Sequence, residues 1–171
     1  GGVCRASLWT GSAASWVDLN PAGATYSRAK GVYGAQQVGV AHVGGVWHAS
    51  LWTGTTTSWV DLNPAGASQS EANGVYGGQQ VGWATVDGVV HASLWSGSAT
   101  SWVDLSPSGT TSSSANGVYG GQQVGEAQVS GAQHASLWSG TAESWMDLHP
   151  AGASASYAYG VYEGRQVGKA I

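Results

Sequence analysis

Apolar and polar residues alternate in short stretches along nearly the whole chain, and glycine-rich turn sequences separate these stretches. Alternation of this kind is typical of β-strands, and Asp87-Gly88 between two such stretches is a strong hairpin signal. In a representative segment the expected strands cover residues 70–76, 79–86, 89–95 and 101–105. Because nothing in the chain shows an apolar stripe at helical spacing, we expect an all-β protein with essentially no helix.

This pattern recurs every 43 residues with no insertion or deletion. The motif His-Ala-Ser-Leu-Trp begins at His48, His91 and His134, and Arg5 stands in place of His in the first copy. A fixed period of this length indicates tandem structural units. We therefore interpret residues 1–171 as a single domain of four repeats, with unit boundaries near residues 23, 66, 109 and 152.

Four short antiparallel strands in a unit of roughly 40–45 residues are typical of a β-propeller blade. The chain starts with the third and fourth strands of one unit (3–19) and finishes with the first and second strands of another (156–171). We predict a four-bladed β-propeller whose ring is closed when these two pairs form one sheet, since pairing removes two exposed edges. The same pairing between two chains would make each chain half of an eight-bladed ring.

Tryptophan is expected to be the main core-forming residue, because large aromatic side chains dominate the energetics of a core and the chain contains no Phe. Eight of the ten Trp recur at the repeat spacing. They are Trp9, Trp52, Trp95 and Trp138 in the third strand and Trp16, Trp59, Trp102 and Trp145 in the fourth.

A repeated His–Asp pair is the feature of the sequence that most resembles a catalytic acid–base pair. It joins His48, His91 and His134 to Asp61, Asp104 and Asp147, with Arg5 and Asp18 in the first unit. A serine lies near each pair, as in a catalytic triad, but a catalytic site needs one asymmetric constellation, and Arg5 cannot act as a base. We interpret the pairs as structural hydrogen bonds. We predict no catalytic residues and no enzyme activity.

Composition narrows the classes of partner. Only 8% of residues are charged, the net charge is −4, and no basic stripe exists, which argues against nucleic acid. No apolar run reaches the roughly 20 residues that a membrane helix needs, so we expect no membrane insertion. The single Cys4 excludes an intrachain disulfide and a multi-cysteine metal site. The opening Gly1-Gly2-Val3 indicates a processed form or an excised fragment.

We expect neither a metal nor a cofactor, because the repeated Asp residues lie in the strand placed outermost and would point away from each other. An ion or small molecule in the central channel is the alternative. It would meet backbone carbonyls or first-strand side chains, namely Ser27, Ser70, Ser113 and Ser156.

Positions that vary among the units are the candidate ligand contacts, because core geometry does not fix them. Trp47 and Trp83 are the two tryptophans outside the repeated core pattern, and exposed indoles suit the apolar faces of sugar rings. The repeated glutamines are the other candidates, either as ligand contacts or as bridges between blades. They are Gln37, Gln80, Gln123 and Gln166.

Three motifs resemble a known family. These are Ala-x-Gly-Val-Tyr-Gly-Gly-Gln-Gln-Val-Gly (72–82), His-Ala-Ser-Leu-Trp (91–95) and Trp-Val-Asp-Leu (102–105). Together they resemble the HAF family of extracellular bacterial repeats. The resemblance implies a propeller-like fold and an extracellular or cell-surface location, and it carries over no catalytic residue. The chain departs from the family where it has serine in place of Phe, at Ser7, Ser50, Ser93 and Ser136.

Our leading hypothesis is a non-enzymatic binding or scaffold module, a monomer or homodimer, with a glycan or other cell-surface ligand. Its quasi-equivalent units would allow multivalent, lectin-like binding. A purely structural surface repeat without a ligand is one alternative, and axial binding of an ion or small molecule is another.

Overall fold

The computed structural model describes residues 2–171, so Gly1, which belongs to the predicted domain, lies outside the described residues. The protein is all-β, as predicted. Its elements are β1 (Ser7–Leu8), η1 (Ala13–Ser15), β2 (Val17–Asp18), β3 (Tyr26–Tyr33), β4 (Gln36–Val43), β5 (Val46–Trp52), η2 (Thr56–Ser58), β6 (Val60–Asp61), β7 (Ala67–Tyr76), β8 (Gln79–Val86), β9 (Val89–Trp95), η3 (Ala99–Ser101), β10 (Val103–Asp104), β11 (Ser113–Tyr119), β12 (Gln122–Val129), β13 (Ala132–Trp138), η4 (Ala142–Ser144), β14 (Met146–Asp147), β15 (Ser156–Tyr162) and β16 (Arg165–Ala170).

Consecutive strands pair in antiparallel order and form separate small sheets. Three sheets have four strands each, β3-β4-β5-β6, β7-β8-β9-β10 and β11-β12-β13-β14. Two further sheets, β1-β2 and β15-β16, have two strands each. The bounds of β8 and β9 coincide with the predicted strands, because Asp87 and Gly88 both have positive φ and make the expected hairpin turn.

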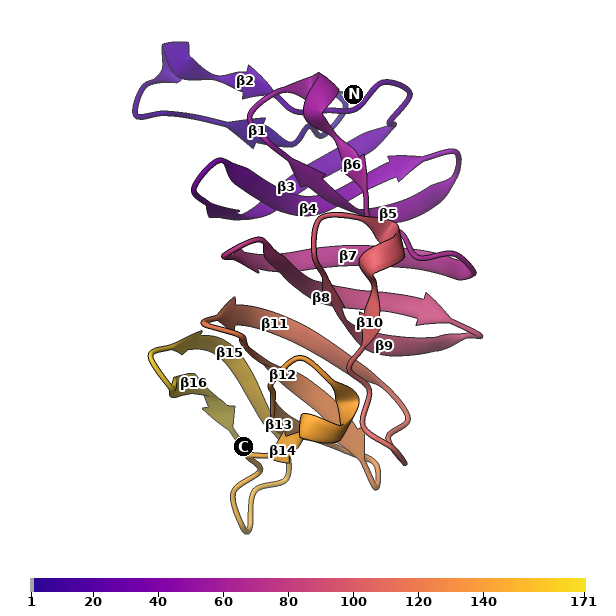
Figure 1. Ribbon diagram of the computed structural model, residues 1–171, viewed down its shortest axis with the longest axis vertical. Helices are drawn as coiled ribbons and strands as arrows, with labels where there is room; N and C mark the ends of the chain where they lie inside the picture. Colours follow the sequence, from indigo (N-terminus) through magenta and orange to yellow (C-terminus); the bar gives the residue numbers. More distant parts are fainter. Residues whose placement is uncertain (1) are drawn as a thin grey trace.

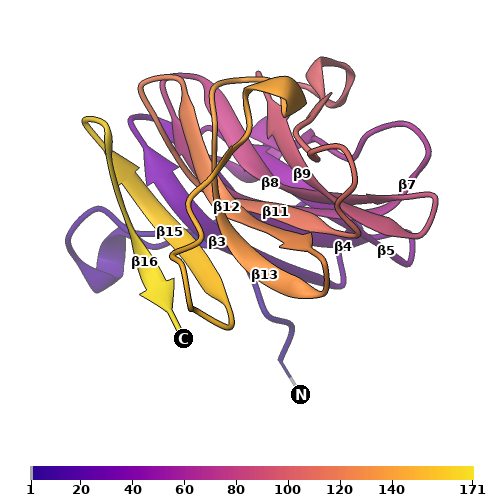
Figure 2. The same cartoon turned by 90° about the horizontal axis from the view of Figure 1, so that it is seen from below.

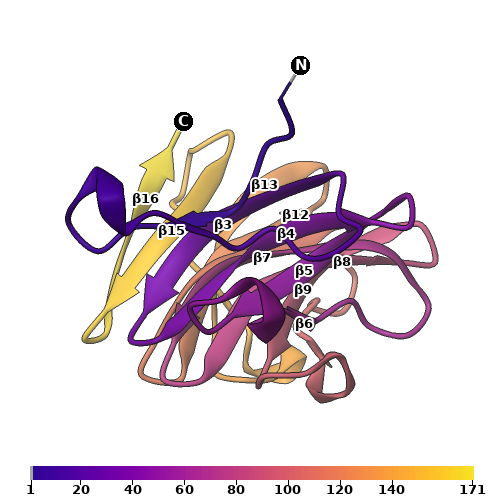
Figure 3. The same ribbon diagram turned by 90° about the horizontal axis from the view of Figure 1, so that it is seen from above.

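The predicted ring is not closed in this structure. In the described part of the chain, no ladder joins β1 or β2 to β15 or β16. The sheets follow one another along the long axis of the molecule, with β1 and β2 at one end and β16 towards the other (Figure 1). Seen along that axis, the sheets lie one behind another (Figures 2 and 3). Each end therefore carries half of a four-stranded sheet.

The fourth strand of each unit is shorter than predicted, because a one-turn 3₁₀-helix takes its first residues. The expected strand 101–105 becomes η3 followed by β10. In the unit before it, the hydroxyl of Ser58 accepts the N–H of Thr53 at 2.8 Å and donates to the carbonyl of Thr55 at 2.6 Å. These side-chain bonds replace a strand ladder, and they account for the four short helical turns that the periodicity did not predict.

A glycine column brings the first two strands of each unit unusually close together. A Cβ at Gly82 would lie 2.0 Å from the carbonyl oxygen of Glu71, so only glycine fits. The first strand has a register irregularity at the same place, between Ala72 and Gly74 in β7. An extra residue of this kind bends a strand and increases its twist.

The core lies between neighbouring sheets and depends on third-strand tryptophans, as predicted. Trp95 packs with Leu51 and Leu62 of the preceding sheet, and it is fully buried. Trp52 and Trp138 are equally buried. The first unit differs, since Trp9 and Trp16 are exposed, and this corrects the prediction that all eight repeated tryptophans are core residues.

Candidate functional site

The two tryptophans singled out as ligand contacts lie in the same hollow. A depression of about 300 Å³ between the sheets β3–β6 and β7–β10 has Trp47 and Trp83 in its lining. The remaining lining residues are Tyr26, Arg28, Val40, Gln69 and Glu71. The hollow combines aromatic faces with an amide and charged groups, a mixture typical of small-ligand sites.

Strand register explains why these residues meet. In the first complete sheet Arg28 lies opposite Val40, and in the next sheet Glu71 lies opposite Trp83. Tyr26 and Trp47 make an edge-to-face contact with ring centroids 5.1 Å apart. Since alternate residues of a strand share a face, these side chains are presented together at the junction of the two sheets.

A charged cluster fixes the polar side of the hollow. Arg28 Nη2 lies 3.0 Å from Glu71 Oε1, and Lys30 Nζ lies 2.6 Å from the same oxygen. Arg28 and Lys30 come from β3 and Glu71 from β7, so the ion pairs cross between sheets. Two cations face one carboxylate, which leaves hydrogen-bond donors in excess at this edge.

The corresponding position in the next pair of units has different chemistry. A hollow of about 190 Å³ lies there, and its lining includes Val90, Glu126 and Gln133. Burial raises the pKa of Glu126, and a hydrogen bond from Asn116 opposes that rise. This hollow has no aromatic lining residue, so it lacks the paired tryptophans of the hollow between the first two complete sheets.

The repeated glutamines take part in the fold. Gln80 is fully buried. Its Oε1 accepts the N–H of Gly97 at 2.7 Å, and its Nε2 donates to the carbonyl of Gly78 at 2.9 Å. Gln37 and Gln123 make the equivalent bonds. Gln166 is less buried and donates to Gly164. Since both ends of the buried amides are bonded to backbone, we leave the glutamines out of the candidate site.

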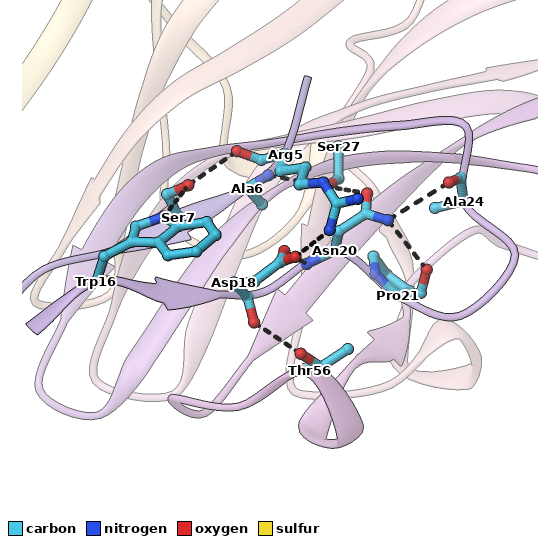
Figure 4. Close-up of polar contacts among 10 residues, drawn as sticks. All are labelled: Arg5, Ala6, Ser7, Trp16, Asp18, Asn20, Pro21, Ala24, Ser27 and Thr56. Carbon is cyan, nitrogen blue, oxygen red and sulfur yellow. Dashed lines mark hydrogen bonds and ion pairs between the residues drawn. The ribbon is translucent and has the colours of Figure 1, made fainter. Parts of the chain in front are cut away.

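The predicted hydrogen bond between His and Asp is present in every complete sheet. His48, His91 and His134 each place Nδ1 2.8 Å from a carboxylate oxygen of Asp61, Asp104 and Asp147, respectively. In the first unit Arg5 binds Asp18, and Thr56 of the next unit donates to the Asp18 carbonyl (Figure 4).

The neighbouring serines serve the tryptophans rather than the histidines. Ser50 accepts the indole N–H of Trp59 at 2.9 Å and donates to the His48 carbonyl. Ser7 and Trp16 make the same contact in the first unit (Figure 4). Because this hydroxyl is bonded to an indole N–H and to a backbone carbonyl, it does not make the serine–histidine hydrogen bond that a catalytic triad requires.

Acid is expected to weaken the fold partly through Asp147. Burial raises the pKa of this carboxyl, but hydrogen bonds from His134 and from the backbone N–H of His149 outweigh burial and hold the pKa below its ordinary value. A depressed pKa contributes stability above the unfolded-state pKa, near 3.9, and that contribution disappears as the pH falls through the folded-state pKa.

Asp147→Asn should therefore flatten the acid limb of stability. Urea denaturation of both proteins from about pH 6 to about pH 2.5 measures this, with wild type losing more stability over that range than the variant. Equal losses in the two proteins would show that Asp147 does not contribute to the acid sensitivity.

The first-strand serines, which were named as contacts for an axial ligand, take part in hydrogen bonds within the fold. Ser70 is buried, accepts the N–H of Ala49 at 2.9 Å and donates to Asn63 Oδ1 at 2.6 Å. Ser27, Ser113 and Ser156 accept equivalent backbone N–H groups. Over residues 2–171, no three His, Cys, Asp or Glu side chains gather closely enough to hold a metal ion.

Tyr26 and Gln69 were missed by sequence reasoning. Each stands two residues before a position that varies among the units, Arg28 or Glu71, and therefore on the same face of its strand. This two-residue spacing from a varying position was the signal in the sequence that could have identified them.

In the described residues, no helix is long and apolar enough to cross a membrane.

No family model, curated protein or solved structure matches the chain. The functional proposal therefore depends on the residues and geometry of this molecule alone.

Proposed function

We propose that the chain is a non-enzymatic binding module that recognises a carbohydrate in the hollow lined by Trp47 and Trp83. The observation that carries the proposal is the convergence of these two tryptophans, from neighbouring sheets, on one depression of about 300 Å³. Both break the repeat pattern of the core, and the position of Trp47 is occupied by valine or glutamine in the next two units.

The chemistry of the hollow matches a sugar better than a purely apolar ligand. An indole face packs against the C–H groups of a pyranose ring, while Arg28 and Gln69 offer donors to its hydroxyl groups. The ion pairs of Glu71 with Arg28 and Lys30 hold the polar side in place before a ligand arrives. A preorganised site loses less free energy on binding than a flexible one.

The second hollow limits the number of sugar sites that each chain can offer. The equivalent hollow at Val90, Glu126 and Gln133 offers no aromatic platform, so we propose one sugar site for each chain. From the resemblance of its motifs to HAF repeats, we also propose an extracellular or cell-surface setting for such a module. A purely structural repeat is the outcome if no ligand is found.

The propeller is part of the same proposal. Each complete sheet has the strand order of a propeller blade, and the two half-sheets contain the four strands of one more blade. We propose that these halves combine in the functional protein.

Replacing Trp83 with Ala should weaken sugar binding by about tenfold or more, because removal of a central aromatic platform costs at least about 1.4 kcal/mol. Binding is measured first on an array of neutral and acidic glycans and then by titration calorimetry with the sugars that bind. Trp47→Ala should have a similar effect.

Tyr159→Ala is the matched control, since Tyr159 is an exposed aromatic on β15 that lies outside the hollow. It should leave binding unchanged. A wild-type protein that binds nothing across a broad array would overturn the sugar proposal. So would undiminished binding by the Trp83 and Trp47 variants.

A further inference from the structure

The two ends of the molecule carry complementary halves of one sheet. β15 and β16 correspond to the first and second strands of a unit, and β1 and β2 correspond to the third and fourth. In the complete sheets the second and third strands form the longest uninterrupted ladders, such as β8 with β9. At the two ends of the described chain this ladder is missing, and an edge of each half-sheet is unpaired.

Both free edges expose apolar side chains that the rest of the molecule buries. Val38, Val81 and Val124 are each 0% exposed, whereas Val167 at the equivalent place in β16 is 67% exposed. Trp52, Trp95 and Trp138 are likewise 0% exposed, whereas Trp9 is 56% exposed. Exposed apolar surface of this kind marks an interaction site.

The packing shows what should cover the C-terminal edge. In three clusters a third-strand tryptophan packs against leucines of the preceding unit, as Trp138 packs against Leu94 and Leu105. The fourth cluster, built around Val124, Leu137 and Ala158, has no such tryptophan among the described residues. Beside it lies a hollow of about 230 Å³ whose lining includes Leu148 and Val167. Trp9 is the one third-strand tryptophan left without an equivalent cluster.

We propose that a second copy of this chain completes the sheet, with β1 of one copy pairing antiparallel with β16 of the other. The ladders within the complete sheets fix the register. Val124 pairs with Leu137 and Gln128 pairs with Gln133, so at the equivalent positions one repeat on, Val167 pairs with Leu8 and Ile171 pairs with Cys4. Trp9 then packs into the hollow beside Leu148.

The source of the missing strands is a second chain because the two edges of one chain lie apart. β1 and β16 lie towards opposite ends of the stack, with three complete sheets between them (Figure 1). Those sheets are fastened to one another, for example by Asn73, whose Nδ2 donates to the Ala115 carbonyl at 3.0 Å. Joining the edges within one chain would require every such interface to change.

A row of tyrosines supports the same head-to-tail contact independently. Successive rings are in contact at a tilt, with centroids 4.4 to 4.5 Å apart, along the row Tyr33, Tyr76, Tyr119 and Tyr162. The terminal rings, Tyr33 and Tyr162, are the exposed ones. When β16 of one copy receives β1 of the next, Tyr162 meets Tyr33 and the row continues. A contact between two different surfaces closes into a ring or propagates, depending on its rotation.

The mass of the protein in solution tests the proposal. Light scattering over a range of concentrations should give wild type a mass of at least two chains, rising with concentration. Val167→Lys should return the protein to the mass of one chain, since a charge then lies in the contact. Val103→Lys is the matched control, because Val103 is exposed on β10 in the middle of the stack, and it should associate like wild type. Wild type that remains one chain at every concentration would overturn the proposal.

Cross-linking tests the register. Directly opposed residues of antiparallel strands have Cα atoms roughly 4.5–5.5 Å apart, which a disulfide can span. Ile171→Cys should therefore form a reducible bond with Cys4 of another copy and give dimers or larger species on a non-reducing gel. Wild type, with Cys4 alone, is the control for random pairing. A bond within one chain, or no bond, would contradict association in trans. Trp83 lies away from this contact, so the sugar proposal stands or falls separately.

Discussion

Gly125→Ala is expected to destabilise the protein by about 3 kcal/mol or more, because its new Cβ would overlap the backbone. The nearest atom to that Cβ is the carbonyl oxygen of Ser114, at 1.9 Å. Overpacking in a core costs about 1–3 kcal/mol when side chains can move aside. Here the obstacle is a strand carbonyl, so β11 and β12 would have to separate. Urea denaturation followed by circular dichroism measures the loss.

Gly160→Ala is the matched control. It changes the same residue type in β15, and the only heavy atom near its Cβ is Val167 Cγ2, at 3.3 Å, in a side chain that can rotate. We expect a loss below about 1 kcal/mol. Similar losses for the two variants would contradict the explanation from backbone overlap.

Trp95→Ala should cost about 3–5 kcal/mol, the range for removing a large aromatic side chain from a core. Trp95 is fully buried between two sheets, where it contacts Leu51, Leu62 and neighbouring residues. Its indole N–H has no hydrogen-bond partner within the described chain. Trp95→Phe should cost less than Trp95→Ala, because both variants remove this unpaired donor but Phe fills most of the space that Ala leaves empty.

Trp9→Ala tests whether a tryptophan at this repeat position stabilises the fold only when it is buried. The two tryptophans occupy the same place in the repeat, yet Trp9 is largely exposed. At low concentration, where single chains predominate, Trp9→Ala should change the free energy of unfolding by less than about 1 kcal/mol. A loss as large as that of Trp95→Ala would mean that Trp9 is buried within its own chain.

Strand positions were predictable because their signals are local. Alternation and the Asp87-Gly88 turn gave the bounds of β8 and β9, and the repeat extended them to every unit. The predicted pairing of β1 with β16 is not present in the structure. It depends on residues far apart in the sequence, and the sequence alone cannot distinguish pairing within one chain from pairing between two. The 3₁₀ turns were missed because a three-residue turn held by side-chain bonds, such as those of Ser58, is too short to show an apolar stripe at helical spacing.

The candidate site was predictable only in part. Trp47 and Trp83 broke the repeat, and the structure brings them into one hollow. The burial of a repeated polar residue depends on how neighbouring segments pack, which the sequence does not show. Gln80 was therefore named as a candidate ligand contact, although its amide is hydrogen-bonded within the fold. Tyr26 was missed because its aromatic partner, Trp47, lies two strands away.

The glycine column and the variable columns lie on different sides of the same strands. Gly82 and Trp83 are sequence neighbours, yet one is fixed by a carbonyl of the adjacent strand and the other faces the hollow. Residues that specify the backbone are thus separate from residues that meet solvent. Substitution at the position of Trp83 can therefore change the chemistry of the hollow while the glycine that lets the two strands approach stays in place.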